Sequence, residues 1–205
     1  MMAGLLQPTS GDVRVQGQPP ASAAARERLS FVFQEPTLMP WASVAANVCL
    51  PLELAGVSRA EADARVAEAL AQVGLDGFGE QRPRELSGGM QMRVSIARGL
   101  VTRPRLLLMD EPFGALDELT RHRLDADLLA LWRAQGLTVV FVTHSLSEAA
   151  YLSSRVVVMA PRPGRIVDDI ALDTPWPREA HHRTSPTFNA VVRRLEDAMA
   201  DAQAG

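Results

Sequence analysis

The chain has 205 residues, of which 47% are hydrophobic, and a formal net charge of -3 at pH 7. This composition is typical of a soluble globular protein, and the length allows one core or one core with a smaller appended lobe. A weakly acidic chain without a basic block argues against nucleic-acid partners, which require many phosphate-neutralising cations. No stretch approaches the roughly 20 apolar residues that cross a bilayer, and the first residues are too short for a secretory signal, so a cytoplasmic location is expected.

Short strand-like segments open the chain. Residues 4–11 have the pattern of a helix end followed by a turn, and the alternation that follows predicts a strand at residues 12–15. A second strand is expected at residues 29–33, where a Gln-Glu-Pro run follows.

The pattern then becomes helical from residue 43 to about residue 74. Ser58 followed by Glu61 predicts a capping box that opens a helix at residues 59–73. Another helix is expected to begin at Ser87, because apolar residues recur at helical spacing as far as Val101.

In the second half of the chain, strands alternate with helices. Strands are expected at residues 106–109, 138–142, 156–159 and 165–170, and helices at residues 119–135, 147–152 and 187–202. The four prolines of residues 161–178 indicate that this stretch is mostly a connector. The alternation predicts an α/β core built on a parallel sheet flanked by helices. We expect the core at residues 1–42 and 102–180, an inserted helical lobe at 43–101, and a C-terminal helix and tail at 181–205.

Two acids follow the apolar strand at residues 106–109. Asp110 and Glu111 therefore lie beyond the carboxyl end of a strand, where open α/β sheets bind ligands. One acid there can hold Mg²⁺ and the next can orient a water for attack. The alternative is that both are surface acids that cap a loop.

The Ser87-Gly88-Gly89 run opens a helix. Ser87 can cap it, and the glycines let backbone N–H groups approach an anion without an intervening side chain. By itself such a run can equally be a plain capped turn. Gln34 and His144 each follow a strand, as the two acids do, although a lone glutamine or histidine is often only structural.

The order and spacing of these residues resemble the nucleotide-binding subunits of ABC transporters along nearly the whole chain. In the terms of that family, the matching motifs are the Q-loop (Gln34), the signature (Leu86-Ser87-Gly88-Gly89), Walker B with its glutamate (residues 106–111), the D-loop (Leu116-Asp117) and the switch histidine (His144). The resemblance implies a P-loop NTPase-like fold and two subunits that sandwich two ATP molecules.

The resemblance also implies a role for each residue. Asp110 and Gln34 would contact Mg²⁺, Glu111 would act as general base, and His144 would contact the γ-phosphate. The signature residues Ser87, Gly88 and Gly89 would contact the nucleotide held by the opposite subunit, and Asp117 would lie across the dimer seam. Met92, where the family usually has glutamine, puts any contact from that position in doubt.

One family element is absent. All 21 basic residues are arginine, so the phosphate-binding pattern G-x-x-x-x-G-K-[ST] cannot occur in these 205 residues. The resemblance implies that the first strand and this loop are missing, and the expectation is an N-terminally truncated copy that cannot turn over ATP by itself. Removing one preorganised donor at a developing charge already costs about 3 kcal/mol.

The segments at residues 33–41 and 161–166 are similar to the branch that imports nitrate, sulfonates or taurine. The resemblance implies a separate permease, a second ATP-binding subunit, an indirectly coupled solute-binding protein, and a peripheral location on the inner face of the cell membrane. Leu38 and Trp41 are candidate apolar anchors for the permease, or they pack inside the lobe.

Two rival functions remain. A non-catalytic subunit could lend its signature to an intact ATPase subunit. A DNA-repair type ABC ATPase would need a long coiled-coil or zinc-bearing insert, for which residues 34–87 leave no room. His181 and His182 are adjacent and diverge, so we read them as part of a solvated linker.

Overall fold

The computed structural model describes residues 1–174 and 176–204. It divides into two compact units, Met1–Val142 and Thr143–Gly205, and each is described by itself.

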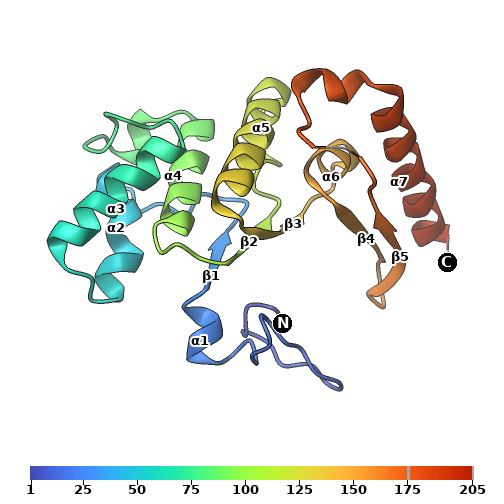
Figure 1. The fold of residues 1–205 in the computed structure, drawn as a ribbon, viewed down its shortest axis with the longest axis horizontal. Helices are drawn as coiled ribbons and strands as arrows, with labels where there is room; N and C mark the ends of the chain where they lie inside the picture. Colours follow the sequence, from blue (N-terminus) through green and yellow to red (C-terminus); the bar gives the residue numbers. More distant parts are fainter. Residues whose placement is uncertain (175, 205) are drawn as a thin grey trace. The chain divides into compact units, whose positions relative to one another are not determined.

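The first unit is built on a three-stranded parallel sheet (Figure 1). Its strands are β1 (Leu29–Val32), β2 (Leu106–Asp110) and β3 (Thr138–Val142), in the order β1-β2-β3. Leu29 and Thr138 both lie opposite Leu106, so all three strands start level and their carboxyl ends share one edge. The parallel sheet predicted from the alternation of elements is confirmed.

Three helices of this unit pack against one another beside the sheet (Figure 1). They are α2 (Val44–Leu54), α3 (Arg59–Gln72) and α4 (Gly88–Leu100), and α5 (Glu118–Gln135) follows β2. These bounds agree with the helices expected from apolar periodicity. The three-part division of the chain into core, lobe and tail remains a prediction.

Helix α4 lies directly on one face of the sheet. A Cβ atom added at Gly99 would lie 3.4 Å from both Val32 Cγ2 and Leu107 Cδ1, so glycine allows the helix backbone to approach β1 and β2 closely. On the other face, Val15 packs with Leu106 and Leu108, and Ala3 lies against that cluster. The central strand is therefore covered on both sides, as its uninterrupted apolar sequence predicts.

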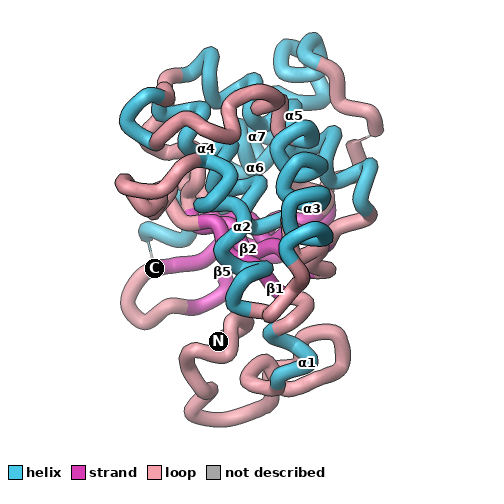
Figure 2. The backbone as a smooth tube through the Cα atoms, turned by 90° about the vertical axis from the view of Figure 1, so that its left-hand side faces the viewer, coloured by secondary structure: helices cyan, strands magenta, loops and turns pink. Residues whose placement is uncertain are grey.

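The strand predicted at residues 12–15 is wrong. Val15 instead forms a single antiparallel bridge with Gln18, across a tight turn in which Gln16 and Gly17 have φ values of 52° and 78°. Val15 is buried by packing on the sheet, without a neighbouring strand to pair with. Residues 4–11 contain bends and no helix end, and the short helix α1 (Ala23–Arg26) was not predicted (Figure 2).

The capping box predicted at Ser58 is also wrong. Ser58 precedes α3, but its side chain makes no capping hydrogen bond. The Glu61 carboxylate, the other half of the predicted box, pairs with Arg65 at 2.6 Å. One half of such a box occurs one element later, at the 3₁₀ turn Pro83–Glu85, where Arg82 N–H donates to Glu85 Oε2 at 2.6 Å.

The second unit contains α6 (Leu146–Leu152), an antiparallel hairpin of β4 (Arg155–Ala160) and β5 (Arg165–Ala171), and α7 (Pro186–Ala204). Helix α7 packs against α6 and both strands (Figure 1). The strand predicted at residues 165–170 is confirmed as β5, and it lies within the stretch of residues 161–178 that was otherwise expected to be a connector. In the described residues, no helix has the length and hydropathy that a membrane span requires.

Arg178 ties the segment after this hairpin to α6. Its guanidinium donates to the backbone carbonyls of Ala150 (3.2 Å), Tyr151 (2.7 Å) and Ser153 (2.8 Å) and to the hydroxyl of Thr174. It also lies over the Trp176 ring, 3.9 Å from the centroid. Only 4% of Arg178 is exposed, and desolvation lowers its pKa to about 10.

His182, four residues further on, makes the second unit sensitive to acid. Burial lowers its pKa, and the charges of Arg178, His181 and Arg183 lower it further. The unfolded chain then takes up a proton below pH about 6.5 that the folded unit does not, so stability falls as pH drops from there through the folded pKa.

We therefore expect wild-type protein to lose more stability between pH 7.5 and pH 5 than the His182→Phe variant, which keeps an aromatic ring beside Phe188. Urea unfolding followed by circular dichroism at both pH values measures the difference. Equal losses in the two proteins would show that His182 does not contribute.

Candidate functional site

The two acids at the end of β2 sit on a strained turn. Glu111 N–H donates to Val142 O at 2.9 Å, which extends the β2–β3 pairing by one residue, and Glu111 itself has a φ of 45°. For a non-glycine residue this left-handed conformation costs of order 1–3 kcal/mol, and such strained residues are enriched at functional sites. Phe113 is fully buried, and its ring packs against Phe141 of β3, which anchors the turn to the sheet.

Gly114 brings Gln34 and Glu111 together. A Cβ atom at Gly114 would lie 3.6 Å from Gln34 Nε2 and 3.9 Å from Glu111 Cβ, so both side chains border the same small space. Gly114 N–H also donates to Glu111 O at 3.1 Å and closes the turn. Sequence reasoning missed Gly114, although a glycine three residues after a strand-ending acid is a signal for a turn of this kind.

The Ser87-Gly88-Gly89 run opens α4 as predicted. Met90 N–H donates to Ser87 Oγ at 3.3 Å, which caps the helix. A Cβ atom at Gly88 would meet Leu116 Cδ2 at 3.6 Å, whereas one at Gly89 would come within 2.7 Å of Thr120 Cγ2. The start of α4 is therefore pressed against the start of α5, and only Gly89 has no room for a side chain.

Asp117 caps the neighbouring helix α5. Its Oδ1 accepts the Thr120 N–H at 3.0 Å. Hydrogen bonds from the Thr120 side chain and backbone lower the pKa of Asp117 below its usual range, so the carboxylate stays charged at the positive end of the helix dipole. The capping residues of α4 and α5 thus lie on helices that begin side by side.

His144 belongs to the second unit, one residue before the cap of α6. Around it, Ser145 N–H donates to Thr143 Oγ1 at 2.9 Å, and the Thr143 hydroxyl donates to the buried Glu148 carboxylate. Ser145 Oγ in turn accepts the Glu148 N–H at 3.2 Å. These bonds define the backbone on both sides of His144. Its grouping with Asp110 and Gln34 remains a prediction.

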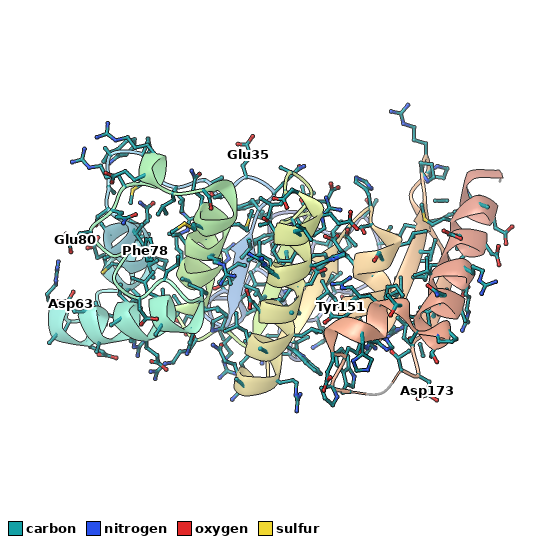
Figure 3. All side chains as sticks on the ribbon, turned by 90° about the horizontal axis from the view of Figure 1, so that it is seen from above. Glu35, Asp63, Phe78, Glu80, Tyr151 and Asp173 are labelled. Atoms are coloured by element: carbon teal, nitrogen blue, oxygen red, sulfur yellow. The ribbon has the colours of Figure 1, made fainter. Side chains whose placement is uncertain are left out.

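The segment after Gln34 is held from two helices, which the sequence did not reveal. Arg98 on α4 donates to the carbonyls of Pro36 and Thr37, and Asn47 on α2 exchanges hydrogen bonds with the backbone of Met39. Glu35, which lies between Gln34 and Pro36 in the chain, projects away from the loop (Figure 3).

Of the two candidate anchors, Trp41 is exposed over 73% of its surface, whereas Leu38 is half-buried. The alternative that Trp41 packs inside the lobe is therefore wrong.

The site offers few metal ligands of its own. Among the described residues, no group of three His, Cys, Asp or Glu side chains gathers around one point. The Asp110 carboxylate and the Gln34 amide oxygen are suitable donors for Mg²⁺, which commonly takes one or two protein ligands and completes its shell with water and phosphate oxygens. Such a donor set suits a metal that arrives with a nucleotide.

Together, the carboxyl ends of β1 and β2 present an amide, two carboxylates and a strained turn at one edge of the sheet. An acid beside a polar amide can hold and deprotonate a water, and a serine-capped helix with free N–H groups can bind an anion. This combination favours chemistry on a phosphate.

Comparison with known proteins agrees with this chemistry. The family described as ABC transporter matches residues 1–114. An uncharacterized ABC transporter ATP-binding protein of Methanocaldococcus jannaschii is 44% identical over 201 residues, which is 98% of this chain and 73% of that protein. The taurine import ATP-binding protein TauB of Pseudomonas putida is 46% identical over 173 residues, 84% of this chain and 65% of TauB.

A solved structure shows the same fold. CbiO1 of Clostridium perfringens, part of the ABC transporter complex CbiONQ, superposes with a TM-score of 0.74 at 28% identity, over 82% of this chain and 68% of that one.

Proposed function

The chain belongs to the ABC transporter family, as an ATP-binding protein of the ABC ATPase type. We propose that it couples the binding and hydrolysis of ATP to the import of a solute through a separate permease. The observation that carries the proposal is that the side chains of Gln34 and Glu111 both lie next to Gly114. This place is beside Asp110, at the carboxyl edge of the sheet. There Asp110 and Gln34 would hold Mg²⁺, and Glu111 would take a proton from the attacking water. For His144 we propose a contact with the γ-phosphate, from its match to the switch histidine of the family.

The solute is proposed from similarity. Two TauB proteins, from Pseudomonas putida and Rhizobium johnstonii, are 46% and 48% identical to this chain and are named for taurine import. We propose that this subunit serves a permease for taurine or a related sulfonate, in a complex supplied by a solute-binding protein. It would lie on the inner face of the cell membrane, held there by the permease.

A second function is favoured by the start of helix α4, where Ser87 caps the helix and Gly88 and Gly89 carry no side chain. These residues can be offered to a nucleotide whose phosphates are held by the loop amides and lysine of another subunit. In that case the chain acts as a non-catalytic partner in a two-subunit assembly.

Co-purification tests both functions. The tagged chain, co-expressed with a taurine-class permease, is expected to retain that permease, and Trp41→Ala is expected to weaken retention at least several-fold because a large exposed aromatic is a frequent interface anchor. Leu54→Ala is the matched control, since Leu54 is also exposed (81%) but lies at the far end of α2.

The outcomes separate the candidates. Retention of the permease together with a second, lysine-bearing ATP-binding subunit supports the non-catalytic role, and retention of the permease with copies of this chain alone supports the first proposal. Absence of the permease from every preparation would contradict both.

A further inference from the structure

Helix α4 carries functional residues at its start and a guanidinium near its end. Arg98 lies about three turns after Ser87, and it reaches the segment that follows Gln34. Arg98 Nη1 donates to Thr37 O at 2.9 Å, and Nη2 donates to Pro36 O at 2.8 Å and to Thr37 Oγ1 at 2.9 Å. One side chain thus binds three acceptors within two residues of the chain.

All three acceptors are neutral. In the part of the chain that the structure describes, Arg98 has no carboxylate partner, and burial lowers its pKa below the ordinary arginine value. A surface arginine used only for solubility would keep its guanidinium in water. The fork geometry of arginine is suited to holding two adjacent oxygens in fixed positions.

The backbone that Arg98 binds is strained. Thr37 has a φ of 47°, in the left-handed region that β-branched residues rarely occupy. Left-handed threonine persists only when its surroundings hold it there. Bonds to both its carbonyl and its hydroxyl provide such a hold.

The position of Arg98 is itself set by packing. The next residue, Gly99, lets α4 touch Val32, the last residue of β1, two positions before Gln34. Asn47 on α2, fully buried, accepts the Met39 N–H at 2.7 Å and so holds the stretch that follows Thr37. From the helix that begins at Ser87, Gly99 thus contacts the chain just before Gln34, and Arg98 binds it just after Gln34.

We propose that Arg98 is a positioning residue that joins the segment after Gln34 to the signature helix, so that the two move as one body. A displacement of residues 35–42 then reaches Ser87 through α4. The consequence for transport rests on the proposed function, whereas the mechanical link is a property of the free chain.

Amide hydrogen exchange on the free 205-residue protein tests the link. Arg98→Ala is expected to speed exchange at the Met39 and Ala42 amides at least tenfold, and Thr37→Val, which removes only the hydroxyl contact, about threefold. The Val101 amide, bonded to Ala97 O at 2.9 Å, reports on α4 itself and should not change. Arg98→Lys should behave like the alanine variant, because one ammonium group cannot reproduce the fork.

Arg105→Ala is the control, since Arg105 is an exposed arginine of the same unit whose side chain makes no hydrogen bond to any described residue. Unchanged exchange at Met39 and Ala42 in Arg98→Ala would overturn the proposal. Equal acceleration at Met39 and Val101 would also overturn it, because Arg98 would then only stabilise α4.

Permease retention supplies a separate readout. If wild-type protein retains the permease, Arg98→Ala is expected to reduce retention while leaving the folded fraction unchanged. If wild-type protein fails to retain it, the proposed function fails, and the exchange result still decides the mechanical link.

Discussion

Replacing Arg178 with alanine is expected to lower the free energy of unfolding of the second unit by about 3 kcal/mol. The substitution removes the donor to three backbone carbonyls at the end of α6, those of Ala150 and Tyr151 buried and that of Ser153 partly buried. Each buried acceptor left without a partner costs about 1–3 kcal/mol. The helix dipole adds to the loss, because a cation at the C-terminal end of a helix is stabilising.

Burial of the guanidinium itself opposes this effect. Desolvation lowers the pKa of Arg178 to about 10, so the charge is less stable in the folded unit than in water. Removing the charge recovers that free energy, but the three carbonyls, the Thr174 hydroxyl and the Trp176 ring all lose their contact. We expect the lost contacts to prevail, because breaking a buried charged network from one side is usually destabilising by 3–5 kcal/mol.

Urea unfolding followed by circular dichroism measures this loss on the whole chain. Arg194→Ala, on the exposed side of α7, is the matched control and should change stability by less than about 0.5 kcal/mol. A stability of Arg178→Ala equal to wild type would mean that water replaces the guanidinium at the end of α6.

The second large effect is a difference between neighbouring glycines. Gly89→Ala is expected to destabilise the first unit by about 1–2 kcal/mol, whereas Gly88→Ala should be neutral or slightly stabilising. Alanine is favoured over glycine in helices by up to about 1 kcal/mol, which both variants gain. Only at position 89 does the new methyl group meet Thr120 Cγ2 at 2.7 Å, and overpacking of this kind typically costs 1–3 kcal/mol.

Thermal and urea unfolding of the two variants provide the comparison. Thr120→Ser in the Gly89→Ala background should restore stability, because serine lacks the clashing methyl group and keeps the hydroxyl that bonds Asp117. Equal stability of the two alanine variants would show that α4 and α5 can separate at no cost. Failure of the rescue would show that the Thr120 methyl group is not the source of the destabilisation.

Much of the fold followed from local signals. The apolar run at β2 and the helical periodicity of α4 and α5 predicted elements within one or two residues of their true bounds, since serine or aspartate caps mark where the helices begin. The placement of Asp110 and Gln34 followed as well, because parallel strands share one carboxyl edge.

The remaining features depend on contacts between distant residues. Arg98 and Thr37 are 61 positions apart, and their bonds use backbone carbonyls, which have no signature in the sequence. Arg178 looked like part of a proline-rich connector for the same reason. The strand wrongly predicted at residues 12–15 is an opposite case, in which a local signal was present but the long-range partner was not. The alternating sequence correctly indicated that Val15 is buried, but no strand lies beside it to form a ladder.

The close approach at Gly99 means that a small rotation of α4 moves its far end by a larger distance. Gly99 contacts β1 and β2 near one end of the helix, and a rise of 1.5 Å per residue places Gly88 about 16 Å away at the other end. A rotation of only about 4° around this contact would displace the N–H groups at the start of α4 by about 1 Å, enough to break or form a hydrogen bond to an acceptor placed there.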